Sequence, residues 1–430
     1  MASPFKTISH TIQASHIREY ARATSPFDAP LLLSVKQYTP LDNSVPKWGD
    51  VTLVATHGSG MPKELYEPLF ESLYMRSKRL GFNIRSIWIA DAAHQGESGV
   101  INEGKLGNDP SWFDHARDII ALVNHFHAQM PRPIVGVGHS MGGGSLVLAS
   151  LMHPRLFTSL LLLEPVFDMS IHECQGPALA RASTFRRDIW NSLDDAETAA
   201  QKRSKGWDPR VFRKWMEYGY RAVPTVPEPD TENCKSSATQ PVTLKTSKHQ
   251  EVFSYLRPNF NGISVADIQD SEPISKATTS NDGSARKMHE IPDIIGPENA
   301  TMPFYRAEPV IAYTALPHLR PSVLYVFGAK SPLATPELRN AKLERTGVGI
   351  SGSGGAGRGR VREVVVPEAT HLLPLEKVEE CGEVMALWLE DEMEKWVVEE
   401  KGLREEWDGK TMEEKTTVSA EWIERIRSML

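Results

Sequence analysis

Residues 133–142 read Pro-Ile-Val-Gly-Val-Gly-His-Ser-Met-Gly, and a helix-like run from Gly143 to Met152 follows them directly. The apolar residues predict a short buried strand, and the G-x-S-x-G pentapeptide at its end places Ser140 on a sharp turn between strand and helix. Small neighbours permit the strained backbone that such a turn requires. We therefore expect the Ser140 hydroxyl to project from a sheet edge as a nucleophile; a glycine-rich turn without chemistry is the alternative.

Further short apolar runs lie on both sides of this motif, and each precedes a turn signal. They are residues 51–56, 84–90, 134–137, 160–163, 323–327 and 364–366, with two earlier runs around residues 12–20 and 31–38 that look like antiparallel opening strands. Buried runs that alternate with helix-like stretches are typical of a parallel sheet covered by helices on both faces. The sequence thus predicts an α/β fold with a mostly parallel, eight-stranded sheet.

The regular alternation of predicted strands and helices is interrupted between residues 166 and 313. This stretch contains helix-like segments at 183–190 and 209–220, and polar, proline-bearing pieces at 223–241 and 267–303. We expect residues 1–165 and 314–430 to form the two parts of one core, and residues 166–313 to form an inserted cap. The glycine-rich tract 347–359 lacks the context of a phosphate loop and predicts a flexible connection, whereas the acidic, tryptophan-containing C-terminal region predicts amphipathic helices.

A serine hydroxyl needs a histidine base and an acid that orients the imidazole. His371 follows the last predicted strand, where such a base belongs. The segment after the seventh strand, residues 327–332, has no carboxylate, so we assign the acid to Glu164, which ends the sixth strand. A carboxylate at the end of an apolar strand is costly to bury without a partner. Asp168 is the alternative acid, and Glu164 as a mere strand end is the alternative without chemistry.

The oxyanion of a tetrahedral intermediate needs two fixed donors, which backbone amides supply. We expect one from Met141 and the other from Ser59, with Gly60 as the alternate, because residues 57–61 follow the third strand. His57 is expected to be a structural residue of that loop. The segment 91–99 opens toward the same edge, where shaping the pocket and simple scaffolding are both open roles.

Composition narrows the function. A formal charge of −7 argues against a nucleic-acid partner, and no apolar run is long enough to span a membrane or to form a signal-peptide core. The three cysteines, Cys174, Cys234 and Cys381, are too few and too widely spaced for a disulfide framework or a zinc site. We expect an intracellular protein without metal or cofactor. The terminal Ser428-Met429-Leu430 is one substitution away from the peroxisomal address SKL, or is simply a helix end.

These motifs together resemble the α/β-hydrolases, and within them the fungal acyl-CoA hydrolases of mycophenolic acid and toxin biosynthesis. The similarity covers most of the chain and runs through residues 15–20, 63–68, 84–100, 105–115, 183–188, 248–254 and 319–321. It implies a peroxisomal thioesterase that frees a carboxylic acid from its coenzyme A thioester, with Ser140, Glu164 and His371 at the positions of the catalytic triad. Two departures are Glu164, where the relative carries the shorter Asp, and the run 142–144 of three glycines, which is smaller than in the relative.

The resulting hypothesis is a serine hydrolase that cleaves a small-molecule acyl-CoA through an acyl-enzyme. Gly60 and Gly142 are candidate substrate-binding residues beside the serine, and Arg186 and Arg187 are candidates to meet the phosphates of coenzyme A, although a mixed-charge helix surface explains the same basic residues. A carboxylesterase, lipase or acyl transferase that uses an oxygen ester or lactone is the alternative, and a non-hydrolytic binding or cyclising protein is a third class. An import receptor at the C-terminus and a homodimer are the expected partners, and the location is the peroxisome or otherwise the cytoplasm.

Overall fold

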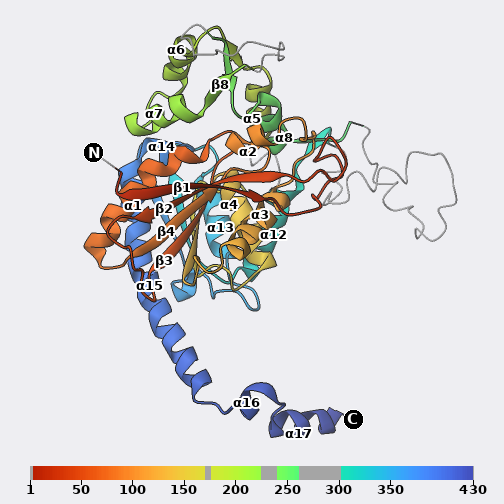
Figure 1. Ribbon diagram of the computed structural model, residues 1–430. Helices are drawn as coiled ribbons and strands as arrows, with labels where there is room; N and C mark the ends of the chain where they lie inside the picture. The colour runs from red at the N-terminus through yellow and green to blue at the C-terminus, as the bar shows by residue number, and fades with distance from the viewer. Residues whose placement is uncertain (1–2, 170–175, 224–239, 261–301, 430) are drawn as a thin grey trace, which may run out of the picture.

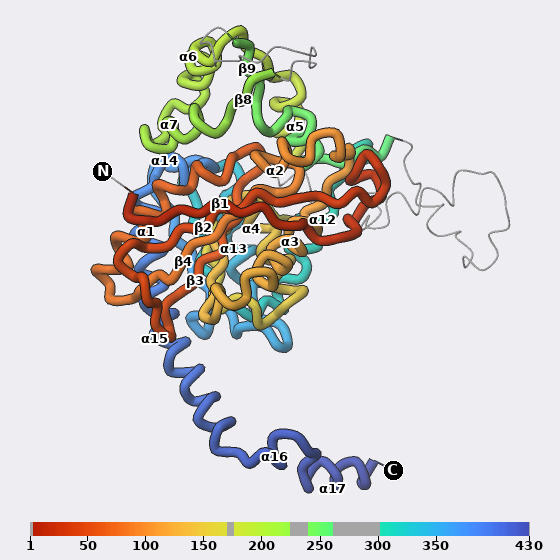
Figure 2. Tube along the Cα trace, in the orientation of Figure 1, coloured from red at the N-terminus to blue at the C-terminus, as the bar shows by residue number. Residues whose placement is uncertain are grey.

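The structure is a computed structural model that describes residues 3–169, 176–223, 240–260 and 302–429. Cys174, Cys234, Leu430 and most of the two polar pieces expected in the cap lie outside the described residues. Figures 1 and 2 show a central sheet with helices on both faces, a smaller group of elements above one edge of the sheet, and a helical C-terminus that leads away from it.

The central sheet has eight strands in the order β1-β2-β4-β3-β5-β6-β12-β13. Their bounds are β1 (Phe5–Gln13), β2 (Leu32–Pro40), β3 (Val51–Thr56), β4 (Ile84–Ala90), β5 (Ile134–His139), β6 (Ser159–Leu163), β12 (Ser322–Gly328) and β13 (Val361–Val366). β1 pairs antiparallel with β2 and β2 antiparallel with β4, whereas the remaining neighbours pair in parallel. The mostly parallel, eight-stranded sheet expected from the sequence is confirmed.

Two apolar layers cover the sheet. One face carries η1 (Lys63–Tyr66), α1 (Glu67–Leu80), α14 (Leu373–Glu376) and the first half of α15 (Val378–Asp408), and the other carries α3 (Trp112–His125), α4 (Met141–Met152), α12 (Ala307–Ala315) and η3 (Leu316–His318). Strands β3, β5 and β6 are buried along their whole length, as continuous apolar runs require. The carboxyl ends of these strands therefore meet at one edge between the two layers.

Most of the described residues between β6 and α12 lie above that edge (Figure 1). Their helices are α5 (Gly176–Thr184), α6 (Leu193–Arg203), α7 (Pro209–Tyr218) and α8 (Lys248–Tyr255). A small antiparallel sheet, in the order β7-β9-β8, is built from β7 (Ile189–Trp190), β8 (Tyr220–Ala222) and β9 (Val242–Leu244), and a hairpin pairs β10 (Arg257–Pro258) with β11 (Phe304–Tyr305). The expected boundary at residue 313 falls inside α12, which packs in the same apolar layer as α4.

Three local expectations were wrong. The first strand ends at Gln13 and not near Tyr20, because its pairing with β2 sets its bounds. Residues 183–190 are not one helix, since α5 ends at Thr184 and β7 begins at Ile189. The glycine-rich tract is not a loose connection: the amides of Gly347, Gly349 and Ser353 donate to carbonyls of residues 316–319, and η4 (Ala356–Arg358) follows.

The C-terminal helices divide into a packed part and an exposed part. The first half of α15 buries Cys381 and Trp388 against the core, and Trp396, further along the helix, is buried beside Trp48. Beyond it, the end of α15, α16 (Met412–Thr416) and α17 (Ala420–Met429) lead away from the body, and Trp407 and Trp422 are exposed (Figure 1). Within the described part of the chain, no helix is long and apolar enough to cross a membrane.

Candidate active site

Ser140 lies at the sharp turn between β5 and α4, as its motif predicts. Its backbone has φ 54° and ψ −122°, an unfavourable conformation for a residue with a Cβ. Close packing holds the turn in place, because a Cβ on Gly142 would lie 2.7 Å from the backbone of Thr56 and His57. The Ser140 side chain is thus presented at the carboxyl edge of the sheet.

His371 and Glu164 meet Ser140 at this edge. The His371 Nε2 atom lies 2.9 Å from the Ser140 Oγ atom, and the His371 Nδ1 atom lies 3.1 Å from Glu164 Oε2. A carboxylate only accepts, so Nδ1 carries the proton and Nε2 is free to accept from the serine hydroxyl. Three side chains from loops that are far apart in the sequence therefore form one continuous series of hydrogen bonds.

The Glu164 carboxylate is buried and held by two further donors. Gly328 N donates to Oε1 at 2.6 Å, and Ser331 Oγ donates to Oε2 at 2.6 Å. Gly328 ends β12 and Ser331 follows it, and this is the strand after which the sequence offered no carboxylate. Ser331 and Gly328 were missed in the sequence analysis; the empty acid position after the seventh strand was the signal that could have pointed to them.

Asp168, the alternative acid, forms an ion pair with a lysine and not with His371. Its Oδ2 atom lies 2.7 Å from the Nζ atom of Lys342 in α13 (Pro336–Arg345), and both side chains are buried. The carboxylate that reaches His371 is that of Glu164.

The loop after β3 presents its amides beside Ser140. Gly58 N donates to Tyr66 Oη at 2.8 Å, and Gly60 N donates to the side chain of Gln95 at 2.7 Å. Within the described part of the chain, the amides of Ser59 and Met141 have no such partner, so both stay candidate oxyanion donors. The amide of Gly60, the alternate donor, is already bonded to Gln95. Gln95 belongs to the segment 91–99, which thereby helps to shape this loop.

His57 is structural, as expected. Its Nε2 atom accepts from Ala92 N at 2.9 Å, so Nδ1 carries the proton and donates to Gly58 O at 2.8 Å. Burial lowers the pKa of His57 and keeps the ring neutral.

A cavity of about 400 Å³ opens above Ser140 and His371. The loop 58–61 forms part of its floor, and aromatic side chains from the inserted segment line its walls, namely Trp190, Trp207, Trp215, Tyr220 and Tyr255. The rings contact one another edge to face, with 5.4 Å between the centroids of Trp190 and Tyr220 and 6.0 Å between those of Trp207 and Trp215. Such walls favour an apolar group.

The candidate substrate-binding residues fall in different places. Gly60 and Arg186 line the cavity, where Arg186 forms an ion pair with the buried carboxylate of Glu251. Arg187 is exposed and its Nε atom donates to Ile189 O at 2.6 Å. Gly142 packs on the backbone at the end of β3 and does not line the cavity, so its missing side chain allows α4 to pack closely against β3.

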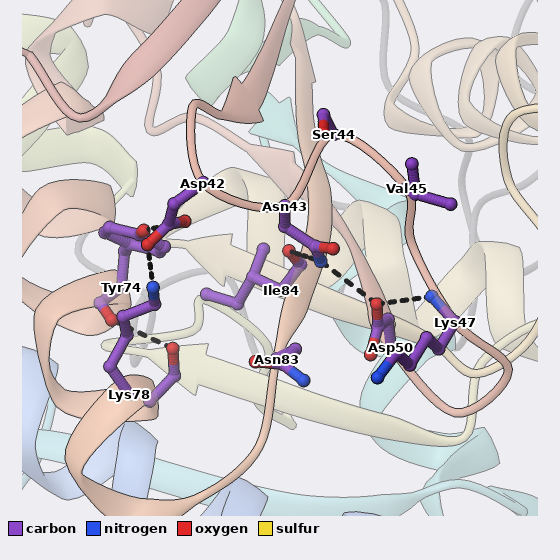
Figure 3. A pocket seen from close by; sticks show the side chains of 11 residues that line it. Asp42, Asn43, Ser44, Val45, Lys47, Asp50, Tyr74, Lys78, Asn83 and Ile84 are labelled. Atoms are coloured by element: carbon purple, nitrogen blue, oxygen red, sulfur yellow. Dashed lines mark hydrogen bonds and ion pairs between the residues drawn. The ribbon is translucent and has the colours of Figure 1, made fainter.

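A second cavity of about 320 Å³ lies far from Ser140, beside the amino ends of β3 and β4 (Figure 3). Asp50 accepts there from Lys47 N and Asn43 Nδ2, and Asp42 contacts Tyr74 and Lys78. Both carboxylates of this cavity are thus paired with neighbouring polar groups. Among the described residues, no cluster of His, Cys, Asp and Glu could hold a metal ion.

A sheet of this order with a serine at the β5–α4 turn defines the class of α/β-hydrolases, and the chain belongs to the alpha/beta hydrolase family, whose sequence profile matches residues 53–384. It is a hydrolase of the α/β type. The chain is similar to the type I acyl-CoA thioesterase mpaH' of Penicillium brevicompactum, with 39% identity over 95% of this chain and 92% of the relative.

Two further similarities are more distant. The abhydrolase domain-containing protein AFT2-1 of Alternaria alternata is 29% identical over 70% of this chain and 100% of its own length. The solved structure of the peroxisomal α/β-hydrolase Lpx1 of Saccharomyces cerevisiae matches 97% of this chain and 100% of that one, with a TM-score of 0.66 and 16% identity, which supports the fold.

Proposed function

We propose that the protein hydrolyses an acyl-CoA thioester to a free acid and coenzyme A. The observation that carries the proposal is the hydrogen-bond series from Glu164 through His371 to Ser140 beneath an aromatic cavity. The name of the Penicillium relative, similar over nearly the whole chain, supports the thioester as substrate. A role in fungal secondary metabolism, including toxin biosynthesis, and a peroxisomal location belong to the same proposal.

The reaction runs through an acyl-enzyme. Ser140 Oγ attacks the thioester carbonyl while His371 Nε2 takes its proton, and the amides of Met141 and Ser59 stabilise the oxyanion. His371 then protonates the departing thiolate of coenzyme A, and finally it activates the water that releases the acid. Glu164 keeps the imidazole in the required tautomer and stabilises its cation.

The inserted segment, residues 166–313, acts in this proposal as a cap. Its aromatic walls hold the acyl group, while Arg187, Lys202, Arg203 and Lys205, which are exposed, meet the phosphates of coenzyme A. Arg186 lines the cavity and is already paired with Glu251, so we do not count it among the residues that meet the phosphates.

The test is release of free thiol from a panel of acyl-CoAs, with Ser140→Ala as the control. We expect rapid release by the natural protein and a loss on the order of 10⁴-fold or more in the variant. Equal release by both proteins would refute the assignment. A matched oxygen ester distinguishes the alternative esterase: a higher kcat/KM for the ester than for the thioester favours that function.

A further inference from the structure

The loop that carries Ser59 and the loop that carries His371 are joined by a series of hydrogen bonds through Tyr66 and His139. Gly58 N donates to Tyr66 Oη at 2.8 Å. Tyr66 Oη lies 2.7 Å from His139 Nδ1, and His139 Nε2 lies 3.0 Å from the backbone oxygen of His371. His139 is the variable residue of the G-x-S-x-G motif, and the proposed mechanism leaves it without a role.

The direction of each bond follows from the chemistry of the end groups. The His371 carbonyl only accepts, so His139 Nε2 must carry a proton. In a neutral imidazole Nδ1 is then the acceptor, and Tyr66 Oη donates to it while accepting from Gly58 N. Burial lowers the pKa of His139 to about 3, so the ring stays neutral over the whole working range of pH.

The groups in this series are buried and closely packed. Tyr66 and His139 are 2% and 1% exposed. A Cβ on Gly58 would lie 2.8 Å from His139 Nδ1, so glycine is the residue that allows the loop to rest on the ring. The His139 and His371 rings lie 5.4 Å apart. Buried groups on both sides therefore hold each partner of the series in place.

We infer that Tyr66 and His139 are positioning residues, which fix the backbone of His371 so that its Nε2 faces Ser140 and which tie that backbone to the oxyanion loop. The inference rests on the proposed function, because positioning matters only if His371 activates Ser140. Tyr66 is not among the residues that line the cavity, whereas His139 is, so the test must separate positioning of His371 from contact with the substrate.

The test measures the rate at which an alkyl fluorophosphonate modifies Ser140, in the full chain. The variants are Tyr66→Phe, His139→Ala and His139→Gln, each also made in a His371→Ala background. Gln retains an N–H donor near the position of the imidazole Nε2. Tyr325→Phe is the matched control: it removes another buried hydroxyl, which bonds Thr346 Oγ1 at 2.7 Å, and Tyr325 packs in the apolar layer opposite to that of Tyr66. Melting temperatures identify variants that fail to fold.

We expect Tyr66→Phe and His139→Ala to slow modification at least tenfold, His139→Gln to recover most of the rate, and Tyr325→Phe to match the natural protein. In the His371→Ala background, His139→Ala should cause less than a twofold further change, since its effect passes through His371. Natural rates in the folded Tyr66 and His139 variants, or an equal loss with and without His371, would overturn the inference. If even the natural protein is not modified, the proposed function itself is wrong, and the inference, which rests on it, is wrong as well.

Discussion

The sheet edge and the inserted segment above it are built in different ways. At the edge, Ser140, His371 and Glu164 are held by short hydrogen bonds to buried groups, many of them backbone amides and carbonyls. In the inserted segment the cavity is lined by aromatic rings in edge-to-face contact and by a few charged side chains. In the proposed function, the edge carries out the reaction and the inserted segment selects the acyl group.

The largest effect should come from the acid at the edge. Glu164→Gln replaces a carboxylate with an amide, which favours the wrong imidazole tautomer, so we expect kcat to fall by about 10³–10⁴-fold. Asp168→Asn is the matched control, since it removes a neighbouring buried carboxylate that pairs with Lys342. Steady-state thiol release should be nearly unchanged in the control, although its stability should fall. If Asp168→Asn were the variant with the greater loss of kcat, the assignment of the acid would be wrong.

The close packing behind Ser140 should be the next most sensitive feature. Gly142→Ala places a methyl group against the backbone of Thr56 and His57, so we expect a destabilisation of about 1–3 kcal/mol or more, together with slower turnover. Gly402→Ala is the control, because that glycine lies in exposed helix with no atom near its added methyl group. Urea unfolding followed by circular dichroism measures both. Natural stability in Gly142→Ala would show that the turn tolerates expansion.

An effect confined to substrate choice should come from the inserted segment. Trp207→Ala shortens one wall of the cavity, and we expect kcat/KM for a bulky acyl thioester to fall about tenfold, while the value for acetyl-CoA stays within twofold. Trp407→Ala, a change to an exposed tryptophan on α15, should alter neither. An equal loss for both substrates would mean that the segment contributes to the reaction itself.

The smallest effect concerns acid stability. The buried His115 has both ring nitrogens without a partner among the described residues, and burial lowers its pKa to about 4. Its unfolded pKa is about 6.5, so between these pH values only the unfolded chain takes up the proton and stability falls as the pH is lowered. His115→Phe should make that fall shallower by about 1.4 kcal/mol per pH unit.

Unfolding free energies measured from pH 7 to pH 4 test this expectation. His127→Phe, at an exposed position, is the control and should leave the slope as it is. An identical slope in the natural protein and in His115→Phe would contradict the proposed neutral state of His115.

The sequence was most informative where local patterns are strong. Buried strands read as continuous apolar runs, and Ser140, Glu164 and His371 each end or follow one of them, so the parallel order brings them to one edge. The two- and three-residue strands β7–β9 are too short to show alternation, and β1 takes its bounds from its partner. Ser331, Tyr66 and Gln95 act through contacts between distant loops, which no local pattern encodes.

The central claim is that the hydroxyl of Ser140 is the reacting group. Titration with a fluorophosphonate, with the adduct mapped by mass spectrometry and residual thiol release measured on the same samples, tests it most directly. We predict one adduct per chain on the peptide that contains Ser140, with activity lost in proportion and no adduct in Ser140→Ala. Full activity after complete modification of Ser140, or loss of activity through an adduct elsewhere, would contradict it.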